Sequence, residues 1–134
     1  MKQVSVFGNI DYAPDALPIK ILPELRNRFA QVRFLVEDPN ELGLITEKDW
    51  IIIDTVMGIK DVKLLSVDQI RKNAPGLVTV HDFDLASQLL WLKKIQKGIE
   101  IKIIGVPPGL PYDEALEKVT AILASLLSKN ETRS

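Results

Sequence analysis

The 134-residue sequence contains no cysteine and a single histidine, His81. The absence of cysteine excludes thiol nucleophiles, disulfide bonds and zinc–thiolate sites. No apolar run approaches the roughly 20 residues that a membrane-spanning helix needs. The opening residues alternate between polar and apolar side chains and are too short for a signal peptide. We therefore expect a cytoplasmic protein.

The charged residues are almost balanced in sign. The chain has 18 acidic and 17 basic residues and a formal net charge of −1. They are interspersed, so no basic patch points to nucleic acid or to an anionic membrane surface. With 46% hydrophobic and 26% charged residues, the composition is that of a globular protein. We expect one domain over residues 1–134, a disordered tail at 129–134 and a monomer.

Segments of strand character alternate with segments of helix character. Parallel strands are expected at residues 3–7, 32–36, 50–54 and 100–106, with a short extended segment at 77–80. The connection after Asp54 is too short for a helical crossover, so 62–67 should be an antiparallel edge strand. This alternation predicts an α/β fold, a three-layer α/β/α sandwich around a mostly parallel twisted sheet of about five strands with one antiparallel edge strand.

Three amphipathic helices are expected, beginning at Pro14 and covering 84–97 and 113–128. Pro23 should kink or split the first helix, because proline has no N–H to donate. Asp84 and Asp113 are expected to cap the helices that follow them. The predicted buried positions of the first and last helices are Leu17, Ile21, Leu22, Leu25, Leu116, Val119, Leu123 and Leu126.

Two ionisable side chains follow predicted strands. His81 comes after 77–80, and Asp54 ends the apolar run Trp50-Ile51-Ile52-Ile53. Ligands bind at this edge of open α/β sheets, and imidazole with carboxylate is a common metal-binding pair. Each also has a structural interpretation: a lone histidine often caps a helix, and a strand-end aspartate often ties a loop. For Asp15, in the first helical turn, the corresponding interpretation is favourable interaction with the helix dipole.

The ordered set of these segments resembles the hydrogenase maturation endopeptidases. The likeness covers residues 4–128. The segments that carry it are Phe7-Gly8-Asn9-Ile10, Asp15, Asp54, His81-Asp82-Phe83-Asp84-Leu85 and Ile104-Gly105-Val106-Pro107.

The resemblance implies a protease that removes the C-terminal extension of the large subunit of a nickel–iron hydrogenase after nickel insertion. The family's metal-binding and catalytic side chains fall on Asp15, Asp54 and His81. Nickel, supplied by the substrate or bound by the protein, is the implied metal, and other divalent ions would fit a similar site. The implied partner is the nickel-loaded large-subunit precursor.

Two other functions stay open. Pro14, Ala16 and Pro18 replace residues usual in the family around the first acid, which suits a non-catalytic escort that binds a hydrogenase-like precursor. The third hypothesis is a small α/β ligand-binding or regulatory domain in which Asp54 alone matters. Convergence of Asp15, Asp54 and His81 would favour the protease.

Overall fold

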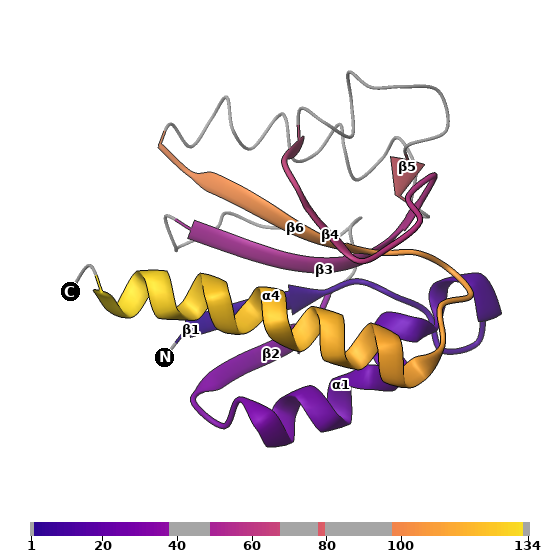
Figure 1. Cartoon of the computed structure of the whole chain (residues 1–134), viewed down its shortest axis with the longest axis horizontal. Coiled ribbons are helices and arrows are strands. Elements are labelled where there is room, and N and C mark those ends of the chain that lie inside the picture. Colours follow the sequence, from indigo (N-terminus) through magenta and orange to yellow (C-terminus); the bar gives the residue numbers. More distant parts are fainter. Residues whose placement is uncertain (1, 38–48, 68–77, 80–97, 133–134) are drawn as a thin grey trace.

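The computed structural model describes residues 2–37, 49–67, 78–79 and 98–132. Its strands are β1 (Lys2–Val6), β2 (Val32–Val36), β3 (Asp49–Met57), β4 (Lys63–Leu65), β5 (Val78–Thr79) and β6 (Glu100–Val106). A 3₁₀ turn, η1 (Ala13–Asp15), precedes helix α1 (Leu17–Arg28), and α4 (Tyr112–Thr132) closes the described part of the chain. The fold is α/β, as predicted (Figure 1).

The sheet is mostly parallel. Its strand order is β2-β1-β3-β6-β4, with β5 paired to β3 outside this path. Strand β1 is parallel to β2 and to β3, and β3 is parallel to β6. The predicted antiparallel edge strand is confirmed, because β4 runs antiparallel to β6. The connection between β3 and β4 is a tight turn in which Gly58 adopts φ 92°, a conformation that suits glycine.

Side chains of β3 alternate between two buried layers. Ile51 and Ile53 face the core that contains α1 and α4, whereas Ile52 and Val56 belong to a second buried cluster on the opposite face. Figure 1 shows α1 and α4 covering the same face of the sheet. The central strands are therefore buried on both faces, as their apolar sequences predicted. The helix expected at 84–97 lies outside the described residues.

A buried hydrogen bond joins the two central strands on the second face. Trp50 Nε1 on β3 donates to Ser5 Oγ on β1 at 2.8 Å. Both residues are buried, and this bond satisfies a donor and an acceptor that would otherwise be costly to remove from water. It also ties together the two strands whose carboxyl ends carry the candidate site.

Helix α1 differs from its prediction in where it begins, and it contains Pro23. It begins at Leu17, because Pro14 lies in η1 and Ala16 stands between the two elements. The helix also passes Pro23 without being split, although the ring leaves the Ile19 carbonyl without the usual backbone donor. The expected apolar face is confirmed: Leu17, Ile21, Leu22 and Leu25 are all buried.

Helix α4 begins at Tyr112 and continues to Thr132, beyond the predicted end at 128. Asp113 is therefore a first-turn residue and not the N-cap expected from sequence. All four predicted core positions of α4 are buried: Leu116, Val119, Leu123 and Leu126. Among the described helices, none combines the length and the apolar character needed to cross a membrane.

Candidate functional site

The strand order reverses between β1 and β3. From β1 the chain crosses to β2 on one side, and from β3 the sheet continues to β6 on the other. In open parallel sheets this reversal leaves a crevice at the carboxyl ends of the two strands, where ligands usually bind. The candidate site therefore belongs where β1 ends and where β3 passes beyond it.

Asp54 lies inside β3, which corrects the expectation that it ends the strand. Val6, the last residue of β1, pairs with Ile53, and the Phe7 N–H donates to the Ile53 carbonyl at 2.9 Å. Strand β3 continues to Met57 because β6 and β5 still pair with it there. Asp54 is thus the first β3 residue past the end of β1, and it is 0% exposed.

Asp15 is held by the compact loop that follows β1. The Asn9 N–H donates to the Asp15 carbonyl at 2.9 Å, and the Asp15 N–H donates to the Tyr12 carbonyl at 2.8 Å. The Asn9 side chain accepts the Asp11 N–H at 3.0 Å, a local turn typical of asparagine. These bonds fix Asp15 at the end of η1, where it is only 1% exposed.

Gly8 is required by the close approach of this loop to α1. A Cβ at position 8 would lie 2.8 Å from Ile19 Cγ1 and 3.0 Å from the Asp15 carbonyl oxygen. The first contact is shorter than real Cβ atoms show, so a larger residue would push the loop away from the helix. Gly8 therefore sets the position of Asp15 through packing, a role that the sequence pattern Gly8-Asn9 did not identify.

The two aspartates interact electrostatically. Burial raises the pKa of Asp54 well above its ordinary value, and the negative charge of Asp15 raises it further. The Thr55 N–H donates to Asp54 Oδ1 at 2.8 Å, which opposes the rise by favouring the ionised form. Of the three predicted site residues, the structure brings Asp15 and Asp54 together, whereas His81 lies outside the described residues.

Thr55, the residue whose N–H binds Asp54, has a buried side chain as well. The residue is 0% exposed, and its Oγ1 has no hydrogen-bond partner among the residues that the structure describes. The sequence itself shows that Thr55 directly follows Asp54. The donation of its N–H to the carboxylate depends on side-chain geometry and was not predicted.

The donor chemistry fits a divalent cation. Two buried carboxylates with mutually unfavourable charge supply hard oxygen ligands, and a cation between them would offset their repulsion. In the part of the chain that is described, no group of three His, Cys, Asp or Glu residues could hold a metal. The two aspartates are therefore two members of the predicted set, and the third, His81, stays a prediction.

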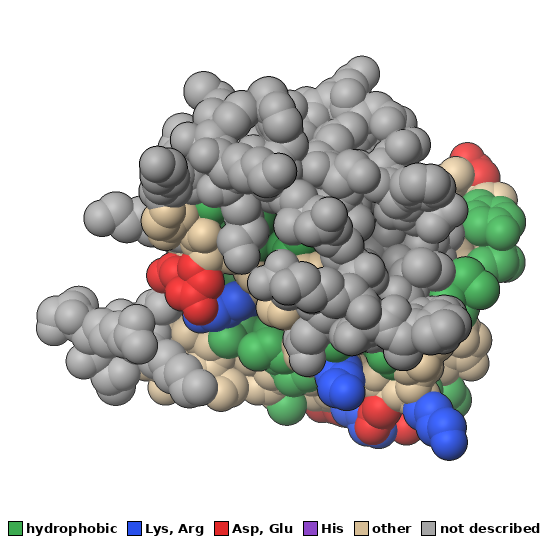
Figure 2. Space-filling view, turned by 90° about the horizontal axis from the view of Figure 1, so that it is seen from above, with side chains coloured by type: hydrophobic (Ala, Val, Ile, Leu, Met, Phe, Trp, Pro, Cys, Tyr) green, Lys and Arg blue, Asp and Glu red, His purple; other side chains and the backbone are tan. Residues whose placement is uncertain are grey.

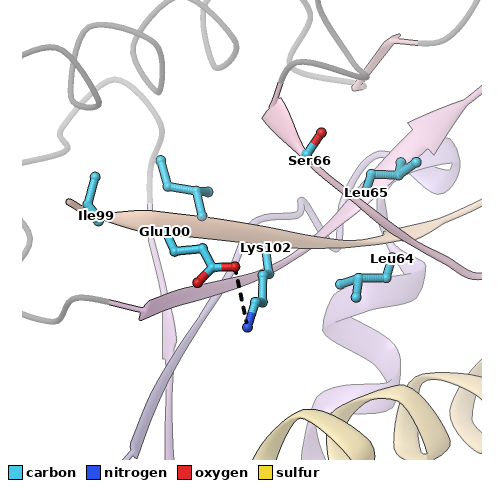
Figure 3. Close-up of a pocket in the computed structure, with 7 residues that line it drawn as sticks. Leu64, Leu65, Ser66, Ile99, Glu100 and Lys102 are labelled. Carbon is cyan, nitrogen blue, oxygen red and sulfur yellow. Dashed lines mark ion pairs between the residues drawn. The ribbon is translucent and has the colours of Figure 1, made fainter. Parts of the chain in front are cut away.

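A separate hollow lies away from the aspartates. It has a volume of about 450 Å³ and lies between β4 and the start of β6 (Figure 3). Glu100 and Lys102, two of its lining residues, form an ion pair at 3.8 Å. They occupy the amino-terminal half of β6, whereas Asp54 pairs with Gly105 near the carboxyl end. The hollow is thus at the wrong end of the parallel strands to be part of the candidate site.

Comparisons with known proteins add no family assignment, because no family model, no curated protein and no solved structure matches the chain.

Proposed function

We propose that this protein is a peptide-bond hydrolase that removes the C-terminal extension of a nickel–iron hydrogenase large subunit after nickel insertion. The proposal joins the sequence resemblance to the chemistry of the site. Asp15, Asp54 and His81 are its proposed metal-binding and catalytic residues. The reaction is proposed for the cytoplasm, with a monomeric enzyme acting on the nickel-loaded precursor.

The observation that carries the proposal is the buried pair Asp15 and Asp54 at the reversal of strand order. Keeping two carboxylates with almost no exposed surface so close to each other is unfavourable for folding, since each disfavours the charge of the other. A cation-binding role gives this costly arrangement a reason, because functional sites often sacrifice stability.

Each residue of the pair has a distinct part in the proposed site. Asp15, fixed by the backbone bonds of the β1–η1 loop, is held in place before any ligand arrives. Asp54 must release its proton to act as a ligand, because only the carboxylate form binds a cation. The Thr55 N–H holds Asp54 Oδ1, which orients the carboxylate.

A divalent ion in this site would polarise the scissile carbonyl and activate water, or nickel in the substrate would itself be the recognition element. In both cases the net reaction is hydrolysis. The water oxygen bonds to the carbonyl carbon, the C–N bond breaks, and the new amine takes a proton. The side chains of the proposed site position the reacting groups and supply charge near them.

Incubation with the nickel-loaded precursor tests the proposal. Mass spectrometry should detect a shortened large subunit with the wild-type chain and an unchanged precursor with Asp54→Asn. Asp49→Asn is a matched control, because it makes the same chemical change at the opposite end of β3. A precursor lacking nickel should stay uncleaved. Cleavage by Asp54→Asn at the wild-type rate would refute the proposed role of the site.

The escort hypothesis has one observation in its favour. Asp15 and Asp54 are 1% and 0% exposed, so a substrate carbonyl has little access to either carboxylate in this conformation. An escort would bind the precursor in wild type and leave it intact. Binding without cleavage, measured with the same nickel-loaded precursor, would therefore favour the escort over the protease.

A further inference from the structure

Buried polar residues are few in the part of the chain that the structure describes, and they are Ser5, Asp15, Asp54 and Thr55. Ser5 is accounted for by the protein itself, because its Oγ accepts the Trp50 Nε1–H at 2.8 Å. Asp15 and Asp54 are the acids of the candidate site. The Thr55 hydroxyl is therefore the buried polar group to which neither the described structure nor the proposed function gives a role.

The position of this hydroxyl is unfavourable for folding. Thr55 is 0% exposed, and its Oγ1 has no hydrogen-bond partner among the described residues. A hydroxyl removed from water without a partner costs free energy, whereas valine has the same shape and lacks this group. The neighbouring buried positions of β3 are filled by isoleucine and valine. A threonine at position 55 therefore points to a partner that the described residues do not supply.

Thr55 is joined directly to one of the two buried aspartates. Its N–H donates to Asp54 Oδ1 at 2.8 Å. Its side chain lies on the face of β3 that α1 covers, because side chains alternate along a strand and Ile53, two residues earlier, packs in the core with α1.

Asp15 is brought to the same face by the segment that leads into α1. Continuing the β1–β3 register by two residues beyond its last pair places Thr55 level with Gly8. A Cβ on Gly8 would lie 3.0 Å from the Asp15 carbonyl oxygen, so the Asp15 segment lies directly over this position. Thr55 is thus bonded to Asp54 through its backbone and shares a face of the sheet with the segment that carries Asp15.

We propose that Thr55 Oγ1 is a further oxygen ligand of the divalent cation held by Asp15 and Asp54. The near-complete burial of all three residues suits a ligand as small as a metal ion. Hydroxyl and carboxylate oxygens are hard donors, and a threonine or serine hydroxyl binds Mg²⁺ in the phosphate-binding loop of many nucleotide hydrolases. The proposal rests on the metal-binding part of the proposed function, and it adds a neutral oxygen to the predicted set of Asp15, Asp54 and His81.

Charged side chains at the surface compete little for such a cation. On the face shown in Figure 2, acidic side chains at the left and along the lower edge lie beside lysine or arginine side chains. Glu100 and Lys102, for example, form an ion pair at 3.8 Å. A neighbouring positive charge repels a metal ion, so metal binding to the protein should report mainly on the buried site.

Titration calorimetry of the full chain with nickel or manganese, after a chelator has removed bound metal, tests the hydroxyl. Thr55→Val removes the hydroxyl and keeps the shape of the side chain. It should raise Kd about tenfold, the usual weight of one bond to a charged group. Thr55→Ser keeps the hydroxyl, and its Kd should stay within about twofold of wild type.

Thermal unfolding without metal is the second measurement. Thr55→Val should be at least as stable as wild type, because it removes a buried hydroxyl that has no described partner. Ser5→Ala is the matched control, since it removes a buried hydroxyl that the Trp50 N–H needs. It should lower the thermal midpoint and leave Kd unchanged. Added nickel should raise the midpoint of wild type more than that of Thr55→Val.

A Kd for Thr55→Val within about twofold of wild type would overturn the proposed ligand, and so would a Thr55→Ser variant that binds as weakly as Thr55→Val. A metal-free Thr55→Val protein that loses as much stability as Ser5→Ala would overturn it too, because the hydroxyl would then have a partner in the protein. If wild type cleaves the nickel-loaded precursor but binds no metal by itself, the Thr55 ligand fails and the protease stands. If wild type and its variants bind metal as expected but the precursor stays intact, the protease fails and the Thr55 ligand stands.

Discussion

Asp15 and Asp54 belong to different elements and are both almost fully buried, and the pKa of Asp54 is raised by its burial and further by the negative charge of Asp15. Asp15 ends the 3₁₀ turn before α1, and Asp54 lies within the central strand β3. The pKa of Asp54 therefore depends on the position of the loop as well as on that of the strand. The consequences can be measured without knowledge of the substrate.

Asp54→Asn should stabilise the protein at neutral pH. The native pKa of Asp54 lies above its ordinary value of 3.8, so between these values the native state holds a proton that the unfolded state has released. Stability therefore falls as pH rises through this window, and the Asp54 charge is unfavourable to folding above it. Asparagine removes that charge and keeps an oxygen for the Thr55 N–H.

Thermal unfolding of wild type and Asp54→Asn across pH checks this prediction. We expect a gain on the order of 1 kcal/mol at neutral pH, the usual scale of single substitutions. The gain should shrink as the pH falls through this window and be lost below about 4, where both states hold the proton. If the variant were less stable than wild type at neutral pH, the Asp54 carboxylate would have to stabilise the fold.

Divalent cations should reverse the stability order of the same two proteins. Nickel, zinc or cadmium that binds the native carboxylates stabilises wild type by mass action, and it should stabilise Asp54→Asn less. Titration calorimetry should show that the affinity for the metal ion decreases as the pH is lowered, because the ligands become protonated. Asp15→Asn and His81→Ala should weaken binding, with Asp49→Asn as the control. Equal affinity for all of them would rule out this metal site.

Gly8→Ala should disturb the site through packing. The added methyl group meets Ile19 Cγ1 at 2.8 Å and the Asp15 carbonyl at 3.0 Å, so the loop must shift. We expect a loss of about 1–3 kcal/mol in the free energy of unfolding and weaker metal binding. Adding Ile19→Ala removes the closer contact, and the double variant should recover part of the loss. Independent, additive effects in this double-mutant cycle would show that Gly8 and Ile19 are not coupled.

Pro23→Ala should raise the thermal midpoint. Pro23 lies exposed inside α1 and cannot donate to the Ile19 carbonyl, whereas alanine restores that bond and favours the helix. The expected gain is about 1–3 kcal/mol. Chemical denaturation measures it, with an unchanged m-value as the sign that compactness is the same. A decrease in stability would indicate that the proline ring makes contacts worth more than the missing hydrogen bond.

The sequence predicted the sheet well because apolar runs and short connections leave few arrangements. The run of isoleucines in β3 and the brief turn after it were enough to predict a buried parallel strand and an antiparallel edge strand. The start of α1 was wrong, because Pro14 suits a 3₁₀ turn as well as the first turn of an α-helix. The end of β3 was misplaced because pairing by β5 and β6, which no local pattern reveals, extends the strand beyond Asp54.

The candidate site was only partly predictable. Asp15 and Asp54 were selected by position and by resemblance, and no sequence rule gives the burial that raises the pKa of Asp54. The contribution of Gly8 depends on its distance from Ile19, a contact made only in the folded chain. The Thr55 N–H bond to Asp54 likewise depends on a side-chain rotamer.

Cleavage of a nickel-loaded large-subunit precursor is the most direct test of the proposed function. Wild type, Asp49→Asn, Asp54→Asn and His81→Ala should be compared at equal concentration, with thermal midpoints measured on the same samples. We predict cleavage by wild type and Asp49→Asn, and none by Asp54→Asn or His81→Ala, with Asp54→Asn at least as stable as wild type. Cleavage that persists in Asp54→Asn, or an Asp54→Asn protein that loses activity only because it unfolds, would contradict the assignment of Asp54 to a hydrolytic site.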